Sequence, residues 1–165
     1  MKQKNDHQEI EITMEHNEFV LYNSQDGNIK TMEVLRVEIN KAGNGVSAHL
    51  PALDGFVIAS STVATLKKEI RASVQFHIEG LYIEERAAWM DGDYDFEFIF
   101  CDIPSLVSGY GDTISQSSLA RIAGINESQM RQYVSGIKSA SPKILKRVEE
   151  GIHRYAEDLK KVHFA

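Results

Sequence analysis

Apolar and polar residues alternate one by one in several stretches of the first hundred residues, which is the pattern of strands with one buried face. We expect strands over residues 18–22, 29–40, 46–50 and 56–59. The Asp26-Gly27 pair between the first two favours a hairpin turn. A last strand is predicted over residues 94–100, where every second position is aromatic, namely Tyr94, Phe96, Phe98 and Phe100.

A helical period separates the fourth strand from the last one. Apolar residues follow one another at intervals of three and four from Val63 to Leu81, and Ser61 or Thr62 can cap the start. Gly92 ends the segment that runs through Trp89. The polar positions of this helix fall opposite its apolar stripe; they are Lys67, Lys68, Glu69 and Arg71. The order β-β-β-α-β predicts a three- or four-stranded sheet with one helix packed on it.

From Asp102 onward the chain carries only helical patterns. Asp102 with Pro104 marks a helix start, and Ser115 can cap a second helix. Gly124 supplies a tight turn, after which Asn126 caps a third helix that stops at Gly136. The inner faces of the second and third helices are predicted at Leu119, Ala120, Ala123, Met130 and Tyr133. Two short helices joined in this way have the geometry of a helix-turn-helix, although an ordinary pair of antiparallel helices would also need the glycine.

The last helix, which opens at Ser141-Pro142, repeats its apolar residues at intervals of three and four over 20 residues. We expect Leu145 and Val148 to pack on the preceding helices of the same chain. The whole apolar stripe is longer than a small helical domain must bury against itself. We therefore assign its remainder to a dimer interface formed by Ile152, Tyr155, Leu159 and Val162.

Composition sets the class of protein. The chain has 165 residues, of which 42% are hydrophobic and 25% are charged, the average for globular domains. No apolar run has the length of a membrane span, and the first residues lack the apolar core of a signal peptide. Cys101 is the single cysteine, either an inert buried thiol or one whose pKa the following helix start lowers. We therefore expect a cytoplasmic protein without a disulfide.

Charge divides the chain near Asp102. Residues 102–165 carry nine Lys or Arg and seven acids, a net +2, whereas residues 1–101 carry nine and seventeen, a net −8. The predicted class is α+β with three parts. They are an N-terminal extension with an extra hairpin strand (1–31), a sheet-and-helix domain (32–101) and an all-α domain with a long terminal helix (102–165).

The segment 113–136 resembles the helix-turn-helix of the Xre and Cro-type repressor family. Ser115-Gln116, Leu119-Ala120, Gly124-Ile125 and Gly136 stand at that family's positions. The resemblance implies that the protein binds operator DNA, with base edges read by Glu127, Ser128 and Gln132. Phosphate contacts are implied for Gln116 and Arg131 and expected for Lys138 and Lys143, each of which is singly also an ordinary surface charge.

The N-terminal part is similar to the HicB antitoxin family. The similarity rests on residues 46–55 (VSAHLPALDG), on Phe56, and on a helix that starts at Thr62 and runs through His77 and Leu81. The family has a partial ribonuclease H fold and commonly ends in a DNA-binding domain. Its partner is a small basic toxin ribonuclease of the HicA type, which the acidic half of this chain is suited to bind.

We expect no enzymatic activity, cofactor or metal. The alternating acids Asp91, Asp93, Asp95 and Glu97 lack the glycine and the distal glutamate of a calcium loop. Ribonuclease H chemistry requires acids that converge from several strands on a metal ion. Glu33 and Glu38 have no matching acids on the neighbouring strands. The sequence therefore predicts a dimeric or higher oligomeric antitoxin and repressor. The alternative is a stand-alone regulator whose N-terminal domain senses a ligand or only oligomerises.

Overall fold

The structure is a computed structural model that describes residues 14–15, 18–22 and 29–164. Its strands are β1 (Met14–Glu15), β2 (Glu18–Tyr22), β3 (Ile29–Ala42), β4 (Gly45–His49), β5 (Val57–Ser60) and β6 (Tyr94–Phe100). Its α-helices are α1 (Val63–Glu79), α2 (Ile103–Tyr110), α3 (Gln116–Ala123), α4 (Glu127–Val134) and α5 (Pro142–Leu159). Two 3₁₀ helices, η1 (Ile83–Glu85) and η2 (Ala88–Asp91), precede β6. The predicted α+β class is confirmed.

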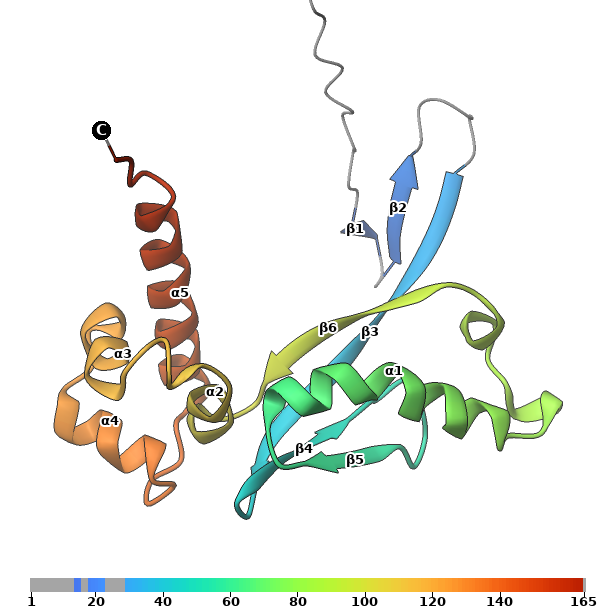
Figure 1. Cartoon of the computed structure of the whole chain (residues 1–165), viewed down its shortest axis with the longest axis horizontal. Helices are drawn as coiled ribbons and strands as arrows, with labels where there is room; N and C mark the ends of the chain where they lie inside the picture. Colours follow the sequence, from blue (N-terminus) through green and yellow to red (C-terminus); the bar gives the residue numbers. More distant parts are fainter. Residues whose placement is uncertain (1–13, 16–17, 23–28, 165) are drawn as a thin grey trace, which may run out of the picture.

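The long strand β3 is the spine of a mixed sheet (Figure 1). Its first residues, 29–33, pair antiparallel with β2, which confirms the additional strand predicted before residue 32. Its last residues, 38–42, pair antiparallel with β4, and β4 in turn pairs with β5. β6 runs parallel to residues 33–39 of β3. The predicted Asp26-Gly27 turn lies outside the described residues.

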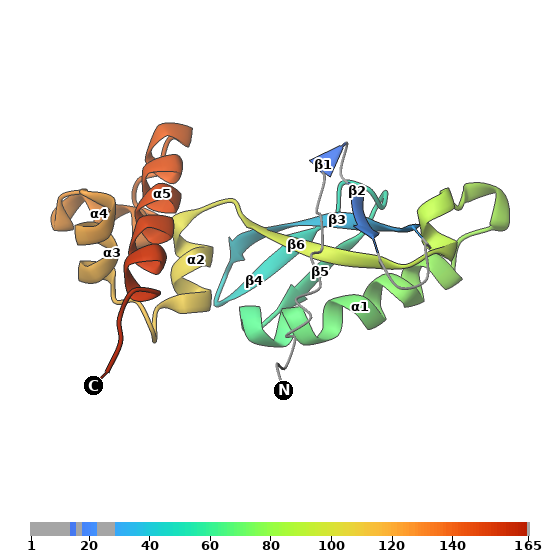
Figure 2. The same ribbon diagram turned by 90° about the horizontal axis from the view of Figure 1, so that it is seen from above.

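Helix α1 covers one face of this sheet, and no described helix covers the other face (Figure 2). Thr62 caps α1 by accepting a hydrogen bond from the backbone N–H of Thr65 at 3.0 Å. The predicted alternation in β3 and the helical stripe of α1 both face a first core, whose buried members include Leu35, Val37, Ile39, Leu66, Ile70 and Val74. Helix α1 ends at Glu79, so Leu81 packs against this core from the following turn.

Two of the charged side chains predicted on the polar side of α1 extend toward β6: Lys67 is half-buried there, so the prediction is wrong for it, whereas Arg71 is exposed as predicted but stacks on aromatic rings of β6. The Lys67 ammonium lies 4.8 Å from the ring centroid of Phe98. The Arg71 guanidinium lies 5.1 Å from the centroids of both Tyr94 and Phe96. A single helix leaves the edge of a wider sheet uncovered, and long side chains with apolar stems extend over it.

The four helices from α2 to α5 lie together at one end of the sheet (Figures 1 and 2). They enclose a second core made of Ile103, Leu119, Ala120, Ala123, Ile125, Met130, Tyr133 and Val148. The first core uses buried residues between 35 and 94, and the second uses buried residues between 103 and 148. The chain therefore buries two hydrophobic clusters that meet near residue 102.

Candidate nucleic-acid interface

Helices α3 and α4 are joined by a turn that depends on Gly124. This glycine has φ +63° and ψ +34°, the left-handed conformation that ends helices, and its N–H donates to the carbonyl of Arg121 at 3.2 Å. The N–H of Ile125 reaches back to the carbonyl of Ala120 at 2.8 Å. Asn126 then caps α4 by accepting from the N–H of Ser128 at 2.8 Å. The predicted cap, turn and second cap are confirmed.

Helix α5 holds this turn through Arg147, a residue that the sequence analysis did not single out. Its guanidinium donates to the carbonyl of Gly124 at 2.5 Å and to that of Ala123 at 3.3 Å. These carbonyls lie at the end of α3, where a helix lacks internal partners and favours a cation. An arginine 23 residues away in sequence gives no local signal for such a contact.

The close approach of α5 to α3 requires Gly151, which also went unnoticed. Gly151 is buried, and a Cβ added there would lie 2.6 Å from the carbonyl oxygen of Ile122. The signal in the sequence is a glycine in the middle of a helix, where it costs stability unless backbones touch. Together with Arg147, this glycine fixes α3 and the turn that follows it against the long last helix.

The outward face of α4 is polar and exposed. Glu127, Ser128, Arg131 and Gln132 are exposed and follow one another at the three- and four-residue intervals of a single helix face. The opposite face carries the buried residues Met130 and Tyr133. All three residues predicted to read base edges therefore lie on one solvent-facing stripe, together with the arginine predicted to contact phosphate.

Gln129 is the exception on this helix. Its amide donates to the hydroxyl of the buried Tyr133 at 2.8 Å, which turns the side chain toward the protein. The structure thereby separates the four polar residues that face solvent from the one that supports the core.

The other predicted phosphate contacts lie at helix ends near this face. Gln116 is the first residue of α3, directly after the cap Ser115. Lys138 is exposed, its backbone N–H donates to the carbonyl of Gln132 at 3.1 Å, and its ammonium lies 5.9 Å from the Tyr133 ring centroid. Lys143 is exposed at the second residue of α5. Main-chain N–H groups at a helix start attract phosphate, as do exposed lysines.

The charge of this region differs sharply from that of the rest of the chain. Residues 113–147 contain six Lys or Arg and one acid, Glu127, a net +5. Residues 79–97 contain seven acids and one base, Arg86, a net −6. A net positive charge in the segment that holds α3 and α4 favours a polyanion, and the acidic segment disfavours one.

One of the four predicted dimer contacts needs correction. Ile152 packs against the second core of its own chain, because the same face of α5 that carries Val148 turns toward α2 and α3. Val162 lies beyond the end of α5 at Leu159, but it is 56% exposed and stays a candidate for contact with a second chain. Tyr155 and Leu159 are exposed on the last turns of α5 and remain candidates for contact with a second chain.

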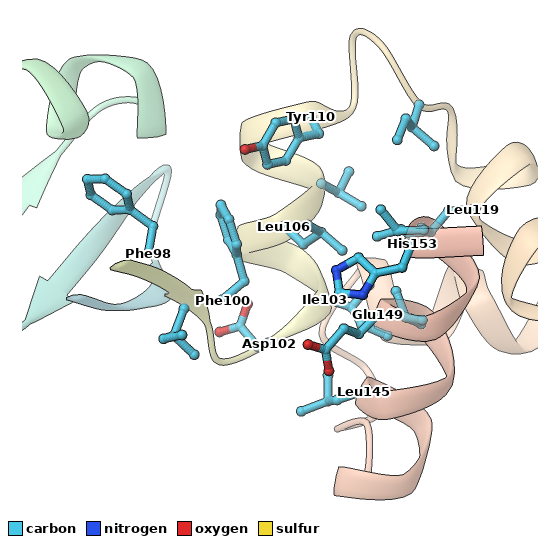
Figure 3. A pocket seen from close by; sticks show the side chains of 15 residues that line it. Phe98, Phe100, Asp102, Ile103, Leu106, Tyr110, Leu119, Leu145, Glu149 and His153 are labelled. Atoms are coloured by element: carbon cyan, nitrogen blue, oxygen red, sulfur yellow. The ribbon is translucent and has the colours of Figure 1, made fainter. Parts of the chain in front are cut away.

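A cavity of about 490 Å³ opens where the end of β6 meets α2 and α5 (Figure 3). Its walls are mainly apolar, and Ile103, Leu106 and Leu145 contribute to them. Glu149 and His153 of α5, Asp102 and the hydroxyl of Tyr110 supply polar groups shown at this cavity (Figure 3). A concave apolar site with a few polar groups is suited to a small ligand.

The acidic segment 79–97 presents apolar side chains among its carboxylates. Tyr82 and Ile83 are 76% and 80% exposed, and Glu84 and Glu85 next to them are exposed as well. Arg86 lies 4.0 Å from Asp91, so the single base of the segment is partly engaged within it. Exposed apolar groups rimmed by charges of one sign are typical of a surface that binds a protein of the opposite charge.

The residues for which we predicted no catalytic role contact neighbouring side chains or are partly buried. Asp95 accepts from Arg71 at 3.2 Å, and Glu38 lies 3.8 Å from His49. Burial raises the pKa of the Cys101 thiol, and the carboxylates of Glu38 and Asp102 raise it further, whereas Arg36 and a hydrogen bond from Asn40 oppose them. Of the two alternatives for this thiol, the raised pKa favours the inert one.

Within residues 14–15, 18–22 and 29–164, no three His, Cys, Asp or Glu side chains gather as metal ligands would. No described helix has the length and apolar character that crossing a bilayer requires. Comparisons of the chain with protein-family models, with curated proteins and with solved structures found no match.

Proposed function

We propose that the protein is a cytoplasmic DNA-binding antitoxin and autorepressor of the HicA–HicB type. In this proposal α3 and α4 form a helix-turn-helix, and the sheet with α1 is a HicB-like partial ribonuclease H domain. The observation that carries the proposal is the exposed polar stripe of α4, held by Gly124 and Arg147 within a segment of net charge +5. The same chain has a segment of net charge −6 for a second partner.

Helix α4 would enter the major groove with its exposed stripe toward the bases. Gln132 can pair with both N6 and N7 of adenine, and Glu127 can accept a hydrogen bond from N4 of cytosine. The hydroxyl of Ser128 can both donate and accept a hydrogen bond, so it discriminates little between bases. Because Arg147 and Gly151 fix α3 and its turn to α5, and α4 packs on α3, the bases would meet a stripe whose orientation is set before binding.

The phosphate contacts would position the protein without reading the sequence. Arg131, Lys138 and Lys143 supply positive charge around α4, and Gln116 brings the start of α3 to the backbone. Two copies joined through Tyr155 and Leu159 would present two such helices to half-sites about 34 Å apart, one turn of DNA.

The acidic segment 79–97 would bind the toxin. A ribonuclease that binds RNA needs a basic surface, and Tyr82 and Ile83 can enter an apolar depression on it while the surrounding carboxylates meet its cations. Coverage of such a surface by a protein of opposite charge would block access of RNA to it.

The proposal is tested by adding the purified full-length protein to a labelled duplex taken from upstream of its own gene and to a scrambled duplex of equal length. We expect tighter binding to the upstream duplex. Co-purification of the protein with the product of the adjacent gene, a small basic protein, tests the second partner. A double variant, Tyr82→Ser with Ile83→Ser, should lose this partner and keep DNA binding.

A second candidate function is a stand-alone regulator that senses a small molecule, and the cavity between β6, α2 and α5 favours it. Its polar groups, Glu149 and His153, lie on the helix that holds α3 and α4, so a ligand there would act on the DNA-binding helices directly. Thermal-shift screening separates the two functions. A regulator gains stability with a small molecule, and an antitoxin gains it with the basic protein.

A further inference from the structure

The outer edge of the sheet at β5 has no partner among the described elements. β5 is the last strand in the order β1-β2-β3-β4-β5, and it pairs only with β4, residue 57 with 49 through residue 60 with 46. One side of its backbone therefore presents N–H and C=O groups that no described strand uses. Such an edge is a template on which another strand can pair.

This edge lacks the features that prevent pairing in monomeric proteins. Edge strands are commonly guarded by lysine, proline or a bulge. The four residues of β5, Val57-Ile58-Ala59-Ser60, include no charge and no proline, and their pairing with β4 runs without interruption. Ile58 packs toward the first core, so the strand is held firmly in an extended conformation.

Exposed apolar side chains lie on both sides of this edge, Val57 on the sheet face that α1 does not cover and Phe76 on α1. Val57 is 65% exposed and Phe76 is 79% exposed. A hollow of about 590 Å³ lies between the start of β5 and α1 and is bounded by Phe76, by the small residue Ala72 and by Lys68. Exposed apolar groups beside a free strand edge mark an interaction site.

The geometry favours a second copy of the same chain as the occupant. The rings of Phe56 and His77 are in contact, with centroids 5.6 Å apart, so α1 runs antiparallel to β5. A helix advances about 1.5 Å per residue and a strand about 3.3 Å, which places Ala72 level with Ile58. A twofold axis at Ile58 then brings Ala72 toward Ala72 of the second copy, where small side chains let two helices approach.

The same axis makes the rest of the surface self-complementary. Phe76 and Lys68 each lie four residues from Ala72 along α1, one on either side. Phe76 of one copy therefore faces Lys68 of the other, whose apolar stem and ammonium pack favourably on an aromatic ring. Antiparallel pairing about Ile58 sets Val57 opposite Ala59 of the second copy, and both side chains lie on the face of the sheet that α1 does not cover.

We propose that β5 pairs with β5 of a second copy about a twofold axis at Ile58, forming one continuous sheet with Phe76 against Lys68. This association is separate from the surface at Tyr155 and Leu159 and does not depend on DNA binding. With both surfaces in use, the protein assembles as a dimer of dimers.

The mass of the full-length protein in solution tests the proposal. The double variant Val57→Lys with Ala59→Lys sets like charges opposite each other across the axis, which destabilises the pair. The double variant Val57→Thr with Ala59→Thr is the matched control, because it keeps β propensity without charge. By sedimentation velocity at one concentration, we expect the lysine variant to have half the wild-type mass and the threonine variant to keep it. Equal circular dichroism and melting of the two variants shows that both are folded.

Cross-linking tests the register. In a Cys101→Ser background, the single variants Val57→Cys and Ala59→Cys are oxidised alone and mixed. The mixture should form a disulfide-linked dimer, whereas each variant alone should remain largely uncrosslinked. An unchanged mass for the lysine variant overturns the proposal, and this is also the result expected if residues 1–13 of the same chain cover β5. A mixture that does not cross-link overturns it as well.

Discussion

Asp102, the residue that caps α2, also accepts a hydrogen bond from the backbone N–H of Lys41 in β3, with an oxygen–nitrogen distance of 2.9 Å. Its other oxygen accepts from the N–H of Ser105 at 2.6 Å. The hydroxyl of Ser105, which is fully buried, lies 3.3 Å from the carbonyl of Ile39 in β3. One carboxylate and one hydroxyl therefore join the start of the helical half to the end of the central strand.

Replacing Asp102 by alanine removes the cap of α2 and the acceptor for Lys41 together. Loss of a capping side chain costs about 1 to 2 kcal/mol of folding free energy. We expect a decrease of about this size in the free energy of unfolding in urea. Asp112→Ala, which removes an exposed acid, is the control and should change stability little. Equal stability of the two variants would contradict the role of Asp102.

Much of the fold could be predicted because local patterns determine it. The alternation in β3 and the three- and four-residue spacing in α1 both face the first core as expected. The caps at Thr62, Ser115 and Asn126 are short-range signals, and each accepts the backbone hydrogen bond that such residues favour.

The features that were missed depend on contacts between distant segments. Lys67 and Arg71 turn toward β6 because the sheet is wider than the helix, which no pattern within α1 reveals. Arg147 reaches a carbonyl 23 residues away, and Ile152 packs on its own chain because α5 lies against α2 and α3. A heptad spacing indicates an apolar stripe but not which surface covers it.

The contact between α5 and α3 predicts that Gly151→Ala is destabilising. The added methyl group would lie 2.6 Å from the carbonyl oxygen of Ile122 and 3.0 Å from Cα of Ala123. Backbone atoms cannot rotate away, so we expect a loss of about 1 to 3 kcal/mol by chemical denaturation. Glu150→Ala, at the adjacent exposed position of the same helix, is the control. A stabilised Gly151→Ala variant, as helix propensity alone predicts, would show that the two helices are not in close contact.

Ile152 and Leu159 should respond differently to aspartate. Ile152→Asp places a charge at a half-buried position against the second core and is expected to lower the free energy of unfolding. Leu159→Asp lies on an exposed turn and should leave folding nearly unchanged while reducing the mass of the particle measured by light scattering. If Leu159→Asp leaves the mass unchanged, the last turns of α5 do not join two chains.

Cys101 is expected to react slowly. Burial first, and then the charges of Glu38 and Asp102, raise the pKa of its thiol, so the reactive thiolate is scarcer at pH 8 than in an unstructured peptide. Alkylation by iodoacetamide at pH 8 should therefore be slower than for a cysteine in such a peptide and should increase as the pH rises. Glu38→Gln removes one cause and should accelerate it. A wild-type rate equal to that of the peptide would contradict the raised pKa.

The central claim is that the exposed stripe of α4 reads DNA sequence, and the most direct measurement compares Gln132→Ala with Lys138→Ala. Duplexes selected from a random pool by the wild-type protein, and scrambled duplexes, are titrated at several salt concentrations. We expect Gln132→Ala to lose about 1 to 3 kcal/mol on the selected duplex and little on the scrambled one. Lys138→Ala should weaken both duplexes alike and reduce the slope of log K against log salt by about one. Equal losses for Gln132→Ala on both duplexes, or no selection from the pool, would contradict the account.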